Sequence, residues 1–215
     1  NMQSVFTDCP HREKLGWLEQ DHLCGPGLLY NYDLTGFLPQ TLQNIADAQH
    51  ANGAVPTTAP EYVVFEGSGM DAFAESPEWG CTFVVLPFMY YETYGDDSLI
   101  RKYYNGMRRY IDYMTTRAND GIVSFGLGDW YDYGDFRAGF SRNTPVPLVA
   151  TAHYYMVVRY LVEAARMLDN RYDVAYYTHL GEEINKAFHR EFYHKDTRQY
   201  GTGSQCSNAL PLFLG

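Results

Sequence analysis

The apolar residues of this chain recur mostly with the spacing of helices. From Asp97 to Arg117 they follow one another at steps of three and four, which places them on one face of a long helix. These positions are Leu99, Ile100, Tyr103, Tyr104, Met107, Tyr110, Ile111 and Met114. Apolar runs and periodic segments, read with the glycines, prolines and asparagines around them, predict four more helices: about 34–49, 79–94, 149–168 and 174–192.

Paired strands are not indicated anywhere along the chain. No two segments alternate apolar and polar residues convincingly, and the short apolar piece 123–125 is expected in a loop. Similar turn sequences follow two of the predicted helices, at 52–56 and at 120–123. Long helices joined as antiparallel hairpins predict an all-α fold, which leaves a bundle, a solenoid or a closed toroid as alternatives.

Composition and charge exclude two classes of partner. The 215 residues carry a net charge of −10 and show no basic cluster, so we expect no nucleic-acid partner. No apolar stretch approaches the ~20 residues that a membrane helix needs, so we expect no membrane span. Aromatic residues make up 16% of the chain, which indicates either a crowded core or a cleft that stacks flat rings against a ligand.

The cysteines and histidines do not form a recognisable metal motif. The four cysteines are far apart in the sequence, and we expect free thiols, with a disulfide as the open alternative: Cys9, Cys24, Cys81 and Cys206. The histidines lack the spacing of a Cys/His metal site. We therefore expect neither a metal nor a cofactor.

Residues 7–21 hold the densest group of chemically active side chains. They combine four carboxylates with His11, Arg12 and Trp17. A glycosidase needs a carboxylic acid whose pKa is raised by a partly dry pocket, an aromatic wall and charged groups that bind sugar hydroxyls. The segment supplies all of these, with a solvated, charge-paired loop as the alternative interpretation.

Two further loops repeat the combination of a carboxylate with an indole. Glu78-Trp79 and Asp129-Trp130 each precede a predicted helix, and together with Trp17 they contain every Trp of the chain. A carboxylate can accept two sugar hydroxyls while an indole stacks on the sugar ring. The alternative interpretation of Glu78-Trp79 is a Glu that favours a helix start together with a core Trp.

These three motifs carry a resemblance to a known family. Asp8-Cys9-Pro10-His11-Arg12-Glu13-Lys14-Leu15-Gly16-Trp17 resembles the signature of bacterial α-L-rhamnosidases, glycoside hydrolase family 78. Pro77-Glu78-Trp79-Gly80 and Gly128-Asp129-Trp130 then follow in the family's order and at similar separation. The resemblance implies an (α/α)₆ barrel, with residues 1–215 as a single domain that forms about its first half. The remainder of the polypeptide would be needed to close the barrel.

The resemblance also implies an inverting glycosidase that removes terminal α-L-rhamnose from glycans or glycosides. The general acid of the family falls on Glu13, and we expect Trp17 to supply an apolar wall that raises the pKa of its carboxyl. The family's general base, a Glu, is expected beyond residue 215. The residues expected to bind or line the sugar are Asp8, Arg12, Trp17, Glu78, Trp79, Asp129 and Trp130.

Two departures from the family pattern bear on this site. Many members have Gly-Asp soon after Gly-Trp, where this chain has Glu19-Gln20-Asp21, and many have Asp where Cys81 stands. Three other interpretations stay open: another (α/α)₆ exo-glycosidase or unsaturated-uronide hydrolase, a helical-repeat scaffold, and a sugar-binding relative without catalysis.

Overall fold

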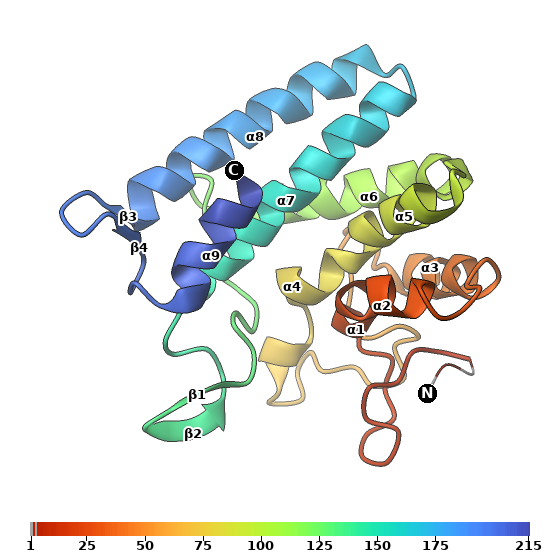
Figure 1. The fold of residues 1–215 in the computed structure, drawn as a ribbon, viewed down its shortest axis with the longest axis horizontal. Coiled ribbons are helices and arrows are strands. Elements are labelled where there is room, and N and C mark those ends of the chain that lie inside the picture. Colours follow the sequence, from red (N-terminus) through yellow and green to blue (C-terminus); the bar gives the residue numbers. More distant parts are fainter. Residues whose placement is uncertain (1, 3) are drawn as a thin grey trace. The chain divides into compact units, whose positions relative to one another are not determined.

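Helices make up most of the computed structural model, which describes residue 2 and residues 4–215 (Figure 1). In chain order they are α1 (Glu19–Leu23), α2 (Gly25–Leu29), α3 (Phe37–Ala48), α4 (Pro77–Gly80), α5 (Thr82–Tyr94), α6 (Ser98–Arg117), α7 (Val146–Met167), α8 (Arg171–Phe192) and α9 (Gln205–Leu214), with a short 3₁₀ turn at Asp71–Phe73. No helix of the described residues is both long and apolar enough to cross a membrane.

The five helices predicted from the spacing of apolar residues are present. The predicted helix over 79–94 is divided at Cys81 into α4 and α5, and α3 begins three residues later than expected. Asn170, which lies between the predicted helices 149–168 and 174–192, caps α8, because its side chain accepts a hydrogen bond from the backbone N–H of Asp173. The short helices α1, α2 and α9 were not predicted.

The expectation that the chain has no paired strands is wrong for two small antiparallel hairpins. One joins β1 (Asp132–Gly134) to β2 (Phe136–Gly139), and the other joins β3 (Tyr193–His194) to β4 (Gln199–Tyr200). Each strand has at most four residues, which is too short for an alternating pattern to show in the sequence.

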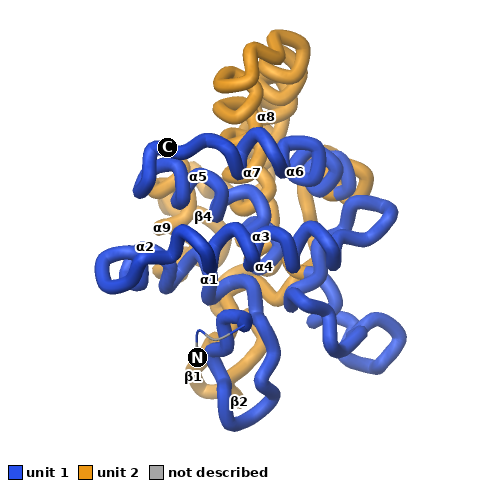
Figure 2. Tube along the Cα trace, turned by 90° about the vertical axis from the view of Figure 1, so that its right-hand side faces the viewer, with its two compact units in different colours: residues 1–75, 79–113 blue, residues 76–78, 114–215 orange. Residues whose placement is uncertain are grey.

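The chain forms two compact units, which Figure 2 distinguishes by colour. Unit 1 comprises Asn1–Glu75 and Trp79–Tyr113, and unit 2 comprises Ser76–Glu78 and Met114–Gly215. The expectation of a single domain over 1–215 stays a prediction.

The core of unit 1 is organised around α5, which packs against α1 and α3. Its side chains Phe83, Val84 and Leu86 are fully buried, and so are Leu38 and Leu42 of α3. Burial of each such side chain stabilises the fold by about 1.5–3 kcal/mol relative to exposure. This packing fixes α1, which begins inside the carboxylate-rich segment 7–21.

Unit 2 is built on the antiparallel pair α7 and α8, which run side by side in Figure 1. Leu148 and Ala152 of α7 pack with Phe188 and Phe192 of α8, and Leu214 of α9 closes the same buried cluster. The loop before α7 carries the third carboxylate–indole motif, so the pair of helices α7 and α8 supports that loop.

The turn after α3 yields a test of the fold of unit 1. Gly53 has φ +97°, and a Cβ added there would lie 2.3 Å from the carbonyl oxygen of Arg109 in α6. Gly53→Ala should therefore lower the free energy of unfolding by about 2–4 kcal/mol, through backbone strain and steric overlap. The measurement is denaturant unfolding.

Gly27→Ala is the matched control. Gly27 lies inside α2 with no other atom near its Cβ direction, so alanine there should leave stability unchanged or raise it by up to about 1 kcal/mol. Equal unfolding midpoints for the two variants would contradict the close approach at Gly53.

Candidate functional site

The backbone around Gly16 is fixed against the chain that follows α3. The N–H of Leu18 donates to the carbonyl of Thr57 at 2.9 Å, and the N–H of Ala59 donates to the carbonyl of Gly16 at 2.9 Å. A Cβ on Gly16 would lie 2.5 Å from the Ala59 carbonyl oxygen. The glycine of the Gly-Trp motif is thus required by the close approach of two backbone segments.

Trp17 is held in place by ring packing and by a hydrogen bond. Its ring stacks on Phe65 with centroids 5.6 Å apart and an interplanar angle of 20°, and Phe73 meets it edge-on at 6.2 Å. Its indole N–H donates to Oε1 of Glu13 at 3.0 Å. The half-buried indole therefore orients the Glu13 carboxylate.

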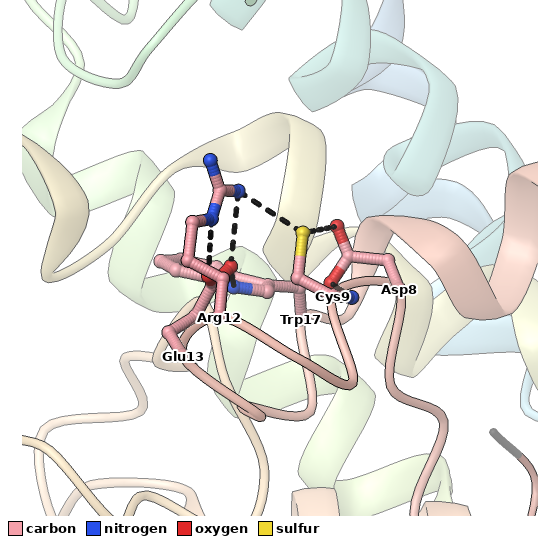
Figure 3. A network of polar contacts seen from close by, with 5 residues as sticks. All are labelled: Asp8, Cys9, Arg12, Glu13 and Trp17. Atoms are coloured by element: carbon pink, nitrogen blue, oxygen red, sulfur yellow. Dashed lines mark hydrogen bonds and ion pairs between the residues drawn. The ribbon is translucent and has the colours of Figure 1, made fainter.

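Arg12 forms the second contact to Glu13 (Figure 3). Its Nε donates to Oε2 at 2.6 Å and its Nη2 to Oε1 at 3.3 Å. The Arg12 hydrogen bonds are the largest cause that holds the pKa of Glu13 at about 2, below the ordinary 4.5, and the Trp17 N–H lowers it further. The expectation that Trp17 raises this pKa is wrong here, because the indole presents its N–H to the carboxylate.

Asp8 and Cys9 complete the cluster that Figure 3 shows. The Cys9 N–H donates to Asp8 Oδ1 at 2.7 Å, and Arg12 Nη2 lies 3.0 Å from the Cys9 sulfur. Ligand-type atoms of Asp8, Cys9 and Glu13 all lie within 4.8 Å of one another. The Arg12 guanidinium supplies their counter-charge, and a raised pKa, caused first by desolvation and then by Asp8 and Glu13, keeps the Cys9 thiol protonated.

The structure distinguishes Glu19 from Asp21, the two carboxylates that follow Gly-Trp in this chain. Asp21 is 2% exposed, burial raises its pKa well above the usual range, and its Oδ1 has no hydrogen-bond partner within the described part of the chain. Glu19 is half-buried, and burial together with the charge of Asp8 raises its pKa to about 7. Of the two, Glu19 is the one coupled to the cluster, a role the sequence did not assign.

In unit 2, the second and third motifs meet through Ser76. The Ser76 hydroxyl donates to Oε2 of Glu78 and accepts from the N–H of Leu127 at 2.8 Å. Gly126 has φ +120°, and a Cβ there would lie 2.9 Å from both Glu78 Oε2 and Ser76 Oγ. Gly126, two residues before the third motif, therefore lets the backbone of this loop pack directly on the Glu78 carboxylate.

Asp129 and Trp130 lie further along the same loop, before the β1–β2 hairpin. Asp129 accepts a hydrogen bond from the Thr144 hydroxyl at 3.3 Å. Trp130 is half-buried and meets Phe140 edge-on, with centroids 5.4 Å apart. The half-buried indole and carboxylate keep part of their surface accessible to a ligand.

Trp79 and Glu78 differ from the other predicted sugar-facing residues. Each is 3% exposed, so the structure places both side chains inside the protein rather than on an open surface. The structure brings Asp8, Arg12, Glu13 and Trp17 together in unit 1, whereas Trp79 of the same unit lies in its interior. The Glu-Trp pair was not distinguishable from a core position by sequence, since an indole serves both purposes.

Comparison with known proteins identifies related chains over the full length. The family model of the bacterial alpha-L-rhamnosidase six-hairpin glycosidase domain matches residues 1–215. An alpha-L-rhamnosidase of Formosa agariphila is 28% identical over 98% of this chain and 23% of its own length. One of Streptomyces avermitilis is 29% identical over 100% of this chain and 19% of its own length.

Solved structures of α-L-rhamnosidases share the fold of this chain. An α-L-rhamnosidase from Dictyoglumus thermophilum has a TM-score of 0.87 and 29% identity, over 100% of this chain and 23% of that chain. The S. avermitilis α-L-rhamnosidase complexed with L-rhamnose has a TM-score of 0.84 and 26% identity, over 98% of this chain and 19% of that chain. The chain thus spans less than a quarter of the length of these relatives, and it belongs to the bacterial α-L-rhamnosidase six-hairpin glycosidase domain family.

Proposed function

We propose that the protein containing this chain hydrolyses terminal α-L-rhamnosides with inversion, and that Glu13 is its general acid. The observation that supports this role most is the hydrogen bond from the Trp17 indole N–H to the Glu13 carboxylate. An acid that protonates a leaving oxygen needs a fixed position, and Trp17 can hold this carboxylate whether or not Arg12 stays paired with it. The rhamnose complex of a relative supports the choice of sugar.

Glu13 must gain a proton before it can donate one. In the structure the Arg12 hydrogen bonds hold the pKa of Glu13 at about 2. The Arg12 side chain is 77% exposed, so water screens this ion pair and can solvate the guanidinium when it moves away from Glu13. We propose that a bound sugar takes over the guanidinium donors through its hydroxyls and excludes water from Glu13. Both changes raise the pKa of Glu13 into the range of a working acid.

The base of the reaction is proposed to be a Glu outside residues 1–215. Within unit 1, an oxygen of Asp8 lies within 4.8 Å of one of Glu13. Inversion needs carboxyl groups about 6.5–9.5 Å apart, so that a water fits between the base and the sugar. Asp8 is too close for that role, and we propose that it binds sugar hydroxyls together with Arg12.

The remaining predicted residues have proposed roles that follow their exposure. Trp17 and Trp130, both half-buried, are proposed to contact the sugar through the accessible parts of their rings. Asp129 is proposed to accept a hydroxyl. The buried Glu78 and Trp79 are proposed to act in the sugar site only after a local change exposes them.

A second candidate function is sugar binding without catalysis. The low pKa of Glu13 favours it, because an ionised carboxylate accepts hydroxyl hydrogen bonds but donates no proton. Hydrolysis of an aryl α-L-rhamnoside by the full-length protein separates the two functions directly.

Glu13→Gln tests the acid role. The substitution keeps the shape of the side chain and removes its proton, so hydrolysis of alkyl and glycosyl rhamnosides should fall by about 10²–10⁴-fold. Rhamnosides whose leaving group is a nitrophenol should lose much less, because such an anion departs without protonation. The measurement is kcat/KM for both substrate types. An equal loss on both would make Glu13 a sugar-binding residue instead.

The anomer released first tests the mechanism. Inversion of an α-rhamnoside yields β-L-rhamnose, which proton NMR detects before mutarotation mixes the anomers. Retention would yield α-L-rhamnose and would assign the nucleophile to a carboxylate near Glu13, since retaining pairs lie about 5–5.5 Å apart. Asp8 would then be the first residue to replace, by Asn, while Asp33→Asn serves as a control on an exposed carboxylate of the same unit.

A further inference from the structure

We propose that Thr144, held by Ser204 at the start of α9, positions the Asp129 carboxylate for binding a sugar hydroxyl. The inference rests on the proposed function, because it takes Asp129 as a residue that accepts such a hydroxyl. It adds two positioning residues that lie outside the three carboxylate–indole motifs. Both act through Asp129 rather than by contact with the sugar.

The first observation is the contact between Thr144 and Asp129. The Thr144 hydroxyl donates to Oδ2 of Asp129 at 3.3 Å, and a carboxylate only accepts, so the direction of this hydrogen bond is fixed. Thr144 is 1% exposed, whereas Asp129 is half-buried. A hydroxyl as buried as this one has little access to water, so it holds the carboxylate in one orientation.

The second observation is that Thr144 is itself held by a helix outside this loop. Its Oγ1 lies 2.7 Å from Oγ of Ser204, which stands 60 residues later in the chain. Ser204 caps α9, because its Oγ accepts from the N–H of Ser207 at 3.1 Å, and α9 packs against α7 (Figure 1). With contacts on two sides, the Thr144 hydroxyl has little freedom to turn away from Asp129.

The third observation is that the backbone beside Thr144 is fastened on both sides. The Thr202 hydroxyl donates to the carbonyl of Asn143, so the segment before α9 holds the residue next to Thr144. Asp132, three residues after Asp129, accepts from the N–H of Asn143 at 2.6 Å. These bonds keep Thr144 and Asp129 together, because they join the two parts of the loop that carry them.

Cys206, in the first turn of α9, borders the same pair. Its thiol contacts both Thr144 and Asp129. Burial first, and then the charge of Asp129, raises the pKa of this thiol to about 11, so it stays protonated at neutral pH. A protonated thiol is a weak donor, so Cys206 places no negative charge beside the carboxylate.

The test is a double-mutant cycle in the full-length protein. Thr144→Val keeps the shape of the side chain and removes its hydroxyl. We expect it to raise the Kd of L-rhamnose and to lower kcat/KM for an aryl α-L-rhamnoside, each about tenfold. Thr144→Ser keeps the hydroxyl and should stay within about twofold of the unmodified protein. In an Asp129→Ala background, Thr144→Val should change both values by less than about twofold, because its effect passes through the carboxylate.

Thr151→Val is the matched control. Thr151 lies in α7 of the same unit and is fully buried, and its hydroxyl contacts the backbone N–H and carbonyl of Val123 at 3.1 and 3.2 Å. The variant should lower the midpoint of thermal unfolding and leave the Kd of L-rhamnose and kcat/KM unchanged. Equal losses of binding in Thr144→Val and Thr151→Val would overturn the inference, and so would additive effects of Thr144→Val and Asp129→Ala.

Ser204→Ala tests the same positioning from the other side, and it serves alone if Thr144→Val does not fold. It removes the contact to Thr144, so the Kd of L-rhamnose should rise about threefold, with no rise in the Asp129→Ala background. A rise of the same size in both backgrounds, or none in either, would contradict the role of Ser204.

Failure of this inference is distinguishable from failure of the proposed function. If Thr144→Val matches an unmodified protein that hydrolyses rhamnosides, the inference fails and the function stands. If the unmodified protein binds L-rhamnose but hydrolyses no rhamnoside, the acid role of Glu13 fails, and the Kd values still decide the role of Thr144. If it neither binds L-rhamnose nor hydrolyses a rhamnoside, both fail.

Discussion

The close approach of Gly16 to Ala59 is the constraint on which the candidate site depends. Two backbone hydrogen bonds of 2.9 Å join residues 16–18 to residues 57–59, and a side chain at Gly16 would separate them. With the backbones in contact, Trp17 reaches Phe65 and Phe73, and its indole N–H reaches Glu13. The orientation of the proposed acid thus follows from packing between two segments about forty residues apart in the chain.

Electrostatics then sets the resting state of this carboxylate. Arg12 and Trp17 both donate to Glu13, which stabilises the ionised form, whereas burial of Glu19 and Asp21 stabilises their protonated forms. Three carboxyl groups within nine residues therefore have very different affinities for a proton. Arg12 is the exposed side of this ion pair, and we propose that a ligand displaces it and thereby changes the charge of Glu13.

Much of this fold could be predicted from the sequence because the long helices bury one face. The apolar spacing from Leu99 to Met114 suffices to locate α6 within a residue or two. The short helices α1, α2 and α9 and the two hairpins have too few residues for any period, so their positions depend on tertiary packing.

The site was predictable in its residue types but not in its contacts. The cluster of Asp8, Arg12, Glu13 and Trp17 follows from one continuous motif. The sequence does not determine the orientation of the Trp17 ring, and so it does not tell which edge of the indole faces Glu13. For this reason the pKa of Glu13 is lowered although the sequence predicted that it would be raised. The burial of Trp79 likewise depends on packing in unit 1.

The central claim is that sugar binding displaces Arg12 and protonates Glu13. Calorimetric titration of the full-length protein with L-rhamnose, in buffers of different ionisation enthalpy, measures the protons taken up on binding. The pKa of Glu13 is about 2 without the sugar, so Glu13 is ionised between pH 4 and pH 6. Because we expect this pKa to rise above that range in the complex, binding there should take up close to one proton per site. Glu13→Gln should abolish the uptake, whereas Glu19→Gln should leave it in place. Binding without proton uptake in the unmodified protein would contradict the account.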